Sequence, residues 1–217
     1  MRKFSGPILW AHRPIKPNLR TKGHRALHLF LKDVFLHDIM KHRKLDNNEL
    51  DRPDLQALKF IERHPVHVVL DNIRSLNNIG SVFRTADAFL AAHIHLCGFT
   101  ATPPHRDIHK TALGATESVP WTHHQQTRQA IELLKSRGVK VWAVEQAEGA
   151  TLLQDWATDQ NQAVAFVFGN EVKGVAQDIV DHCDGVLEIP QHGLKHSLNI
   201  SVSAGMVLWE AFKRYGL

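Results

Sequence analysis

The feature that most constrains the fold is a regular alternation of apolar strands with amphipathic helices, which begins near residue 65 and continues to the C-terminus. Strands and helices that alternate at this spacing are typical of βαβ units built around a parallel sheet. The predicted strands are 66–73, 93–99, 139–145, 162–169 and 185–189, and the predicted helices are 77–92, 106–113, 123–138 and 197–214. The sequence therefore predicts an α/β fold.

Composition and length narrow the class of protein further. The 217 residues are 43% hydrophobic and 22% charged, which suits one globular domain with room for an extension. The two cysteines, Cys97 and Cys183, are too few for a disulfide framework. No apolar run approaches about 18 residues, and the apolar stretch near the start is too short for a signal peptide. We expect a cytoplasmic protein that does not span a membrane.

Charge is distributed unevenly along the chain. Residues 1–63 hold 14 Lys/Arg against 7 Asp/Glu, while the rest holds 12 against 15, and eight Lys/Arg precede Asp33. We interpret residues 1–62 as a basic N-terminal extension, with an extended arm over 1–22 and a helix over 24–44, and residues 63–217 as the main domain. A basic end on a mildly acidic body favours a nucleic-acid partner, and a solvated terminal segment is the alternative.

Common catalytic and metal-binding motifs are absent from the sequence. It has no G-x-G-x-x-G, no Walker A and no G-x-S-x-G. Of its sixteen histidines, His93 and His95 alternate on a predicted strand and His123 and His124 are adjacent in a predicted loop. Because neither of these two pairs has the H-x-x-x-H spacing of metal ligands, and no C-x-x-C accompanies them, we expect no metal site. A hydrolase with a histidine base is an equally weak reading.

Three segments place glycine and polar residues where a predicted strand ends, and in open α/β sheets ligands bind at that edge. Each segment taken alone is explained by a turn or a helix cap; the three together, at separate strand ends, indicate a site. Their polar and glycine positions are Asn78, Gly80 and Arg84 in 70–86, Gly169, Glu171 and Gly174 in 166–175, and Gly193, Ser197 and Asn199 in 187–205. Asn78 is placed to cap the helix that carries Arg84.

The same segments carry a resemblance to a known family. The stretches N-N-I-G-S-V-F-R-T-A, F-G-N-E-V-K-G and I-P-Q-H-G-L-K-H-S-L-N-I-S-V-S-A resemble the three motifs of the SpoU (TrmH-like) family of SPOUT-class methyltransferases. The match runs from about residue 65 to 214, and Gln191 stands where the family often has Met. The first 60 residues match no motif.

The resemblance implies a fold and an activity. The parallel sheet would have its C-terminal part threaded into a deep trefoil knot, which periodicity alone does not indicate. The protein would transfer a methyl group from S-adenosylmethionine to a ribose 2′-hydroxyl of RNA. The partners implied are RNA rather than DNA, with tRNA favoured and rRNA as the alternative, and a second copy of the chain that shares the site.

The resemblance also implies site residues. The catalytic candidates are Asn78, Arg84, Glu171, Ser197 and Asn199, and the cofactor-binding candidates are Glu145, Gly169, Ile189, Ser197 and Leu198. For Arg84, which matches the family arginine, two roles stay open. Because arginine is effectively always protonated, we favour phosphate binding and stabilisation of negative charge on the 2′-oxygen over a role as base.

Two other classes remain as alternatives. A non-catalytic RNA-binding module of the same fold would be expected to have lost Arg84, Glu171 or Asn199, and this chain has all three. A Rossmann-type methyltransferase or reductase would carry a glycine-rich turn after the first strand, which is absent here.

Overall fold

The computed structural model describes residues 42–50 and 52–216. The chain divides into two units, one ending at Arg52 and one beginning at Pro53. In the first, the 3-10 helix η1 (Asn47–Glu49) is capped by Glu49, whose carboxylate accepts hydrogen bonds from Asp46 N at 2.7 Å and from Arg43 at 2.7 Å. The expected arm lies outside the described residues, and so does the expected helix apart from residues 42–44, which are not helical. The domain boundary near residue 62 stays a prediction.

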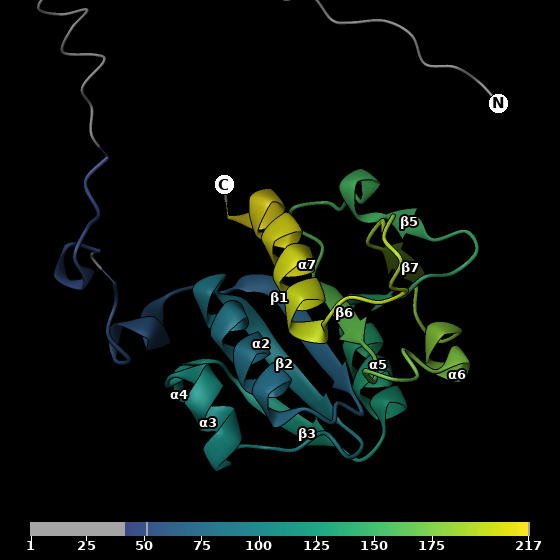
Figure 1. Ribbon diagram of the computed structural model, residues 1–217, viewed down its shortest axis with the longest axis horizontal. Coiled ribbons are helices and arrows are strands. Elements are labelled where there is room, and N and C mark those ends of the chain that lie inside the picture. The colour runs from purple at the N-terminus through teal and green to yellow at the C-terminus, as the bar shows by residue number, and fades with distance from the viewer. Residues whose placement is uncertain (1–41, 51, 217) are drawn as a thin grey trace, which may run out of the picture. The chain divides into compact units, whose positions relative to one another are not determined.

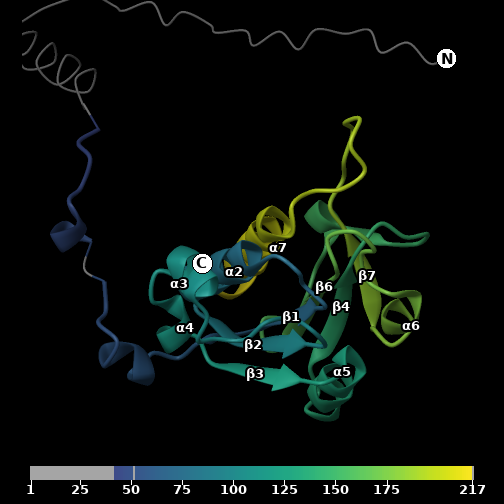
Figure 2. The same ribbon diagram turned by 60° about the horizontal axis from the view of Figure 1, so that its bottom comes forward.

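The second unit contains a seven-stranded sheet in the order β3-β2-β1-β6-β4-β7-β5, and all of its strand pairs are parallel (Figure 1 and Figure 2). This confirms the parallel α/β sheet. The strands are β1 (His64–Asp71), β2 (Ala91–Cys97), β3 (Trp121–His124), β4 (Lys140–Val144), β5 (Thr151–Leu152), β6 (Val164–Phe168) and β7 (Gly185–Glu188).

Helices cover both faces of the sheet (Figure 2). The helices of this unit are η2 (Ala57–Phe60), α2 (Leu76–Ala88), α3 (Arg106–Ala112), α4 (Ala115–Ser118), α5 (Thr127–Ser136), η3 (Leu153–Asp155), α6 (Gln177–Val180) and α7 (Ile200–Tyr215). One core lies beneath α2 and α7 and includes Val68 and Phe83; the other lies beneath α5 and includes Val69 and Leu134. Consecutive residues of β1 thus enter opposite cores, as in a strand buried on both faces. No helix within the described segments is long and apolar enough to cross a membrane.

Four local expectations differ from the structure. The expected helix 123–138 begins only at Thr127, because Gln126 N donates to Gln129 Oε1 at 3.2 Å in a capping box; His123 and His124 lie on strand β3 instead of in a loop. The strand β5 was not expected. The last helix begins at Ile200 rather than at residue 197.

The fourth difference concerns the start of α2. Ser75 caps this helix, and its Oγ accepts a hydrogen bond from the backbone N–H of Asn78 at 3.3 Å. Asn78 is therefore not the cap but lies within the first turn. Its side chain is consequently free to contact other loops.

Gly80 allows α2 and α3 to pack closely. A Cβ at this position would lie 2.3 Å from the carbonyl oxygen of Ile108. Any side chain at Gly80 would therefore push the two helices apart. The glycine of the first motif is explained by packing.

The strand order reverses between β1 and β6. From β1 the chain proceeds outward through β2 and β3, and β6 later occupies the other side of β1. In open parallel sheets, such a reversal leaves a crevice outside the carboxyl ends of the two strands, where ligands bind. All three motif segments leave the sheet at this edge.

Four histidines form a cluster on one face of β1, β2 and β3. Nitrogens of His67 and His95 lie 3.3 Å apart, those of His95 and His124 lie 3.0 Å apart, and the rings of His93 and His95 are 4.6 Å apart. Burial, and then the neighbouring histidines, lower the pKa of His67 to about 4 and that of His95 to about 2. Over residues 42–50 and 52–216, no group of three or more His, Cys, Asp or Glu is arranged to hold a metal ion.

Lowered histidine pKa values predict that acid destabilises the protein. Below pH about 6.5 the unfolded chain takes up protons that the folded cluster does not, so stability is complete above that pH and falls on acidification. As the pH falls toward the His67 pKa of about 4, this residue should lower the free energy of unfolding by up to about 1.4 kcal/mol per pH unit. The free energy of unfolding, measured with urea at several pH values between 7.5 and 5, should change less steeply with pH in His67→Gln than in the wild type. The control is His109→Gln at an exposed position of α3. An equal change of slope in both variants would contradict the assignment to the cluster.

Candidate functional site

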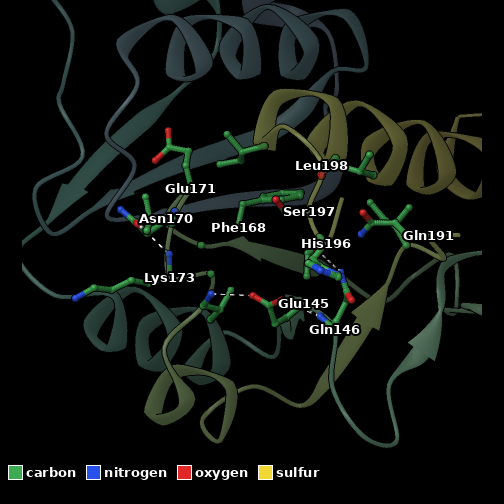
Figure 3. A pocket seen from close by; sticks show the side chains of 18 residues that line it. Glu145, Gln146, Phe168, Asn170, Glu171, Lys173, Gln191, His196, Ser197 and Leu198 are labelled. Atoms are coloured by element: carbon green, nitrogen blue, oxygen red, sulfur yellow. Dashed lines mark hydrogen bonds between the residues drawn. The ribbon is translucent and has the colours of Figure 1, made fainter. Parts of the chain in front are cut away.

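A cavity of about 420 Å³ lies at the carboxyl ends of β4, β6 and β7 (Figure 3). Three loops surround it, those that follow these three strands, and the start of α7 closes one side. Its lining residues are Val144–Gln146, Phe168–Val175, Ile189, Gln191, His196–Leu198, Ile200 and Ser203. Apolar side chains such as Phe168, Ile189 and Leu198 alternate with backbone polar groups, as in sites that take flat, partly apolar ligands.

The side chain of Glu145, directly after β4, holds the loop after β6. Its Oε2 accepts a hydrogen bond from Val175 N at 3.0 Å, and its Oε1 accepts one from Gln146 N at 2.9 Å. Gly174 lies against this carboxylate with φ +67°, and a Cβ there would be 2.2 Å from Glu145 Oε2. A glycine is needed here for both the backbone conformation and the space.

The next residue, Gln146, holds the third loop. Its Nε2 donates to the carbonyl oxygen of His196 at 2.8 Å, immediately before Ser197. Its neighbour Glu145 donates its backbone N–H to the carbonyl oxygen of Leu187 in β7 at 3.1 Å. Two consecutive residues thus connect all three loops of the cavity.

Glu171 joins the second motif to the first. Its carboxylate accepts hydrogen bonds from the backbone N–H groups of Arg74 and Ser75, both at 3.0 Å, and from Asn78 Nδ2 at 3.1 Å. Partial burial acts to raise the pKa of Glu171, but these donors together hold that pKa below its ordinary value. The group is therefore a carboxylate at neutral pH.

Asn199 extends this connection to the third motif. Its Nδ2 donates to Asn78 Oδ1 at 3.2 Å, while its Oδ1 accepts from Ser201 N at 2.8 Å and so caps α7. Asn78 thus lies between Glu171 and Asn199. One hydrogen-bonded chain links residues that are 93 and 121 positions apart in the sequence.

The structure brings together all but one of the candidate residues. The five expected to bind the cofactor line the cavity, and so does Glu171; they are Glu145, Gly169, Ile189, Ser197 and Leu198. Asn78 and Asn199 join Glu171 through hydrogen bonds. Arg84 lies on the exposed side of α2 and does not line the cavity, and within the described part of the chain its guanidinium has no hydrogen bond or ion pair.

Two residues of the site, Asn170 and Gln146, were not among the candidates predicted from the sequence. Asn170 Nδ2 donates to the carbonyl oxygen of Asn72 at 2.7 Å, and Asn170 Oδ1 accepts from Lys173 N at 3.2 Å. The position of Asn170 between Gly169 and Glu171 was the available signal, whereas nothing in the sequence around Gln146 indicates its long-range partner.

Comparison with known proteins agrees with this geometry. The model of the SpoU rRNA Methylase family matches residues 65–209. The 23S rRNA (guanosine-2′-O-)-methyltransferase RlmB of Neisseria meningitidis is 32% identical over 159 residues, 71% of this chain and 60% of the relative. The tRNA (guanosine(18)-2′-O)-methyltransferase of Thermus thermophilus is 31% identical over 144 residues, 66% of this chain and 72% of the relative.

Solved structures show the same architecture. The AdoMet-bound rRNA methyltransferase of Sinorhizobium meliloti superimposes with a TM-score of 0.64 at 28% identity, covering 72% of this chain and 59% of the other. The TrmH/SpoU tRNA modifying enzyme of A. aeolicus, at 24% identity and a TM-score of 0.66, shows the fold. The chain spans about 60% of the length of the first curated relatives it matches. Because the family model covers the sheet and all three motifs, the chain belongs to the SpoU rRNA Methylase family.

Proposed function

We propose that the protein transfers a methyl group from S-adenosylmethionine to a ribose 2′-hydroxyl of RNA. The observation that carries the proposal is the hydrogen-bonded chain from Glu171 through Asn78 to Asn199, beside the cavity that Gly169, Ser197 and the other candidates line. The names of the relatives from Neisseria and Thermus support this activity, one acting on rRNA and the other on tRNA.

The cavity suits S-adenosylmethionine in size and chemistry. Its volume of about 420 Å³ falls in the range of small-molecule sites. Phe168, Ile189 and Leu198 offer apolar surface for an adenine ring, and loop backbone groups offer hydrogen bonds to its edge. The bound cofactor supplies a methyl group activated by a sulfonium. Glu145 and Gln146 keep the surrounding loops in place through Val175 N and the carbonyl oxygen of His196.

The remaining residues position the RNA. In the transfer, the 2′-oxygen would form a bond to the methyl carbon as the carbon–sulfur bond breaks, and the hydroxyl proton would pass to solvent water. Ser197 and Asn199 are placed to orient the ribose, while Asn78 and Glu171 fix the first and second motif loops against each other. Arg84 binds the adjacent phosphate and stabilises the negative charge that develops on the 2′-oxygen.

The exposed position of Arg84 is accounted for by a homodimer in which Arg84 of the partner subunit completes each site. An apolar strip on α7 supports this assembly: Val202, Met206 and Trp209 are exposed, Trp209 by 47%. The Trp209 ring lies 5.9 Å from that of Phe89, so aromatic side chains of α7 and the end of α2 widen the strip. A second copy would bury this surface.

The proposal also covers the substrate class, the cellular location, the knot and the N-terminal extension. The substrate is RNA rather than DNA, with tRNA favoured, and the protein acts in the cytoplasm. A trefoil knot is supported by strand order, since β6 and β7 each lie between strands that precede them in the chain. The N-terminal extension adds RNA affinity through its Lys/Arg excess.

Cofactor binding can be tested with two glycine substitutions. Gly174→Ala would displace the Glu145 carboxylate, whereas Gly138, with φ +78° and no atom within 4 Å of its missing Cβ, is the matched control. Both variants should lose about 1 kcal/mol of stability from the positive φ. In titration calorimetry with S-adenosylmethionine, only Gly174→Ala should bind at least about tenfold more weakly, which corresponds to about 1.4 kcal/mol. Failure of the wild-type protein to bind would refute the proposed function, and equal affinity of the two variants would refute the role of Glu145.

Arg84 can be tested by mixing variants. Arg84→Ala should lower methyl transfer to RNA by about two orders of magnitude or more while cofactor affinity stays unchanged, because the charge acts on the transition state. The assay holds S-adenosylmethionine well below its Kd for Gly174→Ala, so that the sites of this variant stay largely empty. If the arginine acts across subunits, co-refolding Arg84→Ala with Gly174→Ala should then restore about a quarter of wild-type activity, since half of randomly paired dimers hold one intact site. Lack of restoration in verified mixed dimers would place Arg84 in its own subunit's site.

A further inference from the structure

Phe99 is a large aromatic residue exposed at the carboxyl edge of the sheet. Strand β2 ends at Cys97, and Gly98 and then Phe99 follow it. Of the surface of Phe99, 62% is accessible. Phe83, Phe166 and Phe168 are buried in the core of the same unit, whereas Phe60, before the first strand, is exposed as Phe99 is. An exposed ring of this size loses the free energy that its burial would provide.

The backbone on both sides of Phe99 is fixed by hydrogen bonds. Phe99 N donates to Asn72 Oδ1 at 3.2 Å, and Gly98 N donates to the carbonyl oxygen of His124 at 3.0 Å. Thr100, 2% exposed, donates its hydroxyl to the carbonyl oxygen of Leu70 at 3.0 Å. The ring is therefore presented on a rigid turn and does not belong to a loop free to fold it inward.

Gly98 shows how closely this turn is fitted. Its φ is +62°, and a Cβ there would lie 2.1 Å from Asn72 Oδ1, the same atom that accepts from Phe99 N. Asn72 itself has φ +55°, which is uncommon for a residue other than glycine. Backbone in such conformations persists when the surroundings enforce it, and is concentrated at functional sites.

The turn is connected to the candidate active site. The carbonyl oxygen of Asn72 accepts from Asn170 Nδ2 at 2.7 Å, and Asn170 precedes Glu171 in the second motif. β2, β1 and β6 are neighbours in the sheet, so the ends of β2 and β6 are about 10 Å apart, two strand spacings. Phe99 thus lies within reach of a nucleotide next to one bound at the rim.

Two cations at this edge can contact a polyanion, beside the Glu171 carboxylate, which accepts hydrogen bonds from Arg74 N and Ser75 N. Arg74, in the turn after β1, and Lys173, in the loop after β6, are both exposed. Cations of this kind contact phosphates, while an aromatic ring stacks on an unpaired base of single-stranded RNA.

We propose that Phe99 is a stacking platform for a nucleobase of the RNA, adjacent to the nucleotide that is methylated. The inference rests on the proposed function and adds a subsite to it. The ring stacks on the base face and so accepts any base, while Arg74 and Lys173 contact the flanking phosphates. RNA with an unpaired base next to the target binds more tightly than RNA paired there.

The test compares planar and non-planar side chains. Phe99→Tyr keeps an aromatic face, Phe99→Leu keeps apolar area without one, and Phe99→Ala removes both. Leu113→Ala is the matched control, because Leu113 is 65% exposed in the loop between α3 and α4. The probe is fluorescein-labelled unmodified tRNA from cells that lack the gene, measured by anisotropy. Affinity should fall about tenfold in Phe99→Ala and Phe99→Leu, and should stay near wild type in Phe99→Tyr and Leu113→Ala.

Parallel measurements separate this inference from the proposed function. S-adenosylmethionine affinity, melting temperature and molecular mass in solution should be the same in all variants. Unchanged tRNA affinity in Phe99→Ala, full affinity in Phe99→Leu, or dissociation of the assembly by Phe99→Ala would each overturn the platform while methyl transfer by the wild type stands. A wild-type protein that binds tRNA but transfers no methyl group to either tRNA or rRNA would instead refute the proposed function.

Discussion

The carboxylate of Glu171 is the contact on which the candidate site depends. It reaches from the loop after β6 to the turn after β1, where it accepts hydrogen bonds from the backbone N–H groups of Arg74 and Ser75 and from the side-chain amide of Asn78. These two strands are neighbours only because the chain returns to β1 after forming β2 to β5. A charged acceptor that satisfies several donors is stronger than a neutral one, and loss of it would leave those donors unpaired.

The residue before Glu171 makes the opposite kind of contact with the same turn. Asn170 donates to the carbonyl oxygen of Asn72, while Glu171 accepts from the N–H groups that follow. The β6 loop is therefore attached to the β1 turn by a donor and an acceptor in succession, which fixes its register. From this turn, Asn78 continues to Asn199 at the start of α7, and Asn72 continues to Phe99. Asn199, at the candidate site, and Phe99, the proposed base platform, are two ends of one polar network.

The sequence predicted the architecture well where hydrophobic period decides structure. Strands such as 164–168 are continuously apolar, and the three motifs fall at their ends because Gly169 and Pro190 interrupt the pattern. It failed at β3, where His123 and His124, which are not strong strand formers, pair with Leu96 and Cys97 of β2. It also misplaced the cap of α2, because Ser75 and Asn78 are both good capping residues three positions apart. A contact between residues far apart in the sequence, such as that of Gln146 with His196, cannot be predicted from the residues around either partner.

The location of Arg84 illustrates the same limit. The sequence predicts that Arg84 lies in one site with Glu171, but α2 carries Arg84 on its exposed side, away from Asn78. Six positions along a helix turn a side chain by about 240°, so residues close in a motif need not share a face. A second copy of the chain would resolve this geometry, and the apolar strip of α7 would provide the surface for it.

The most direct measurement of the central claim is mass-spectrometric mapping of 2′-O-methylated nucleotides in tRNA and rRNA from cells with and without the gene. The account predicts that a specific 2′-O-methyl nucleotide disappears on deletion, and that purified protein restores it in the extracted RNA only when S-adenosylmethionine is added. The same set of 2′-O-methyl nucleotides in both RNA samples, with no methyl incorporated by purified protein, would contradict it.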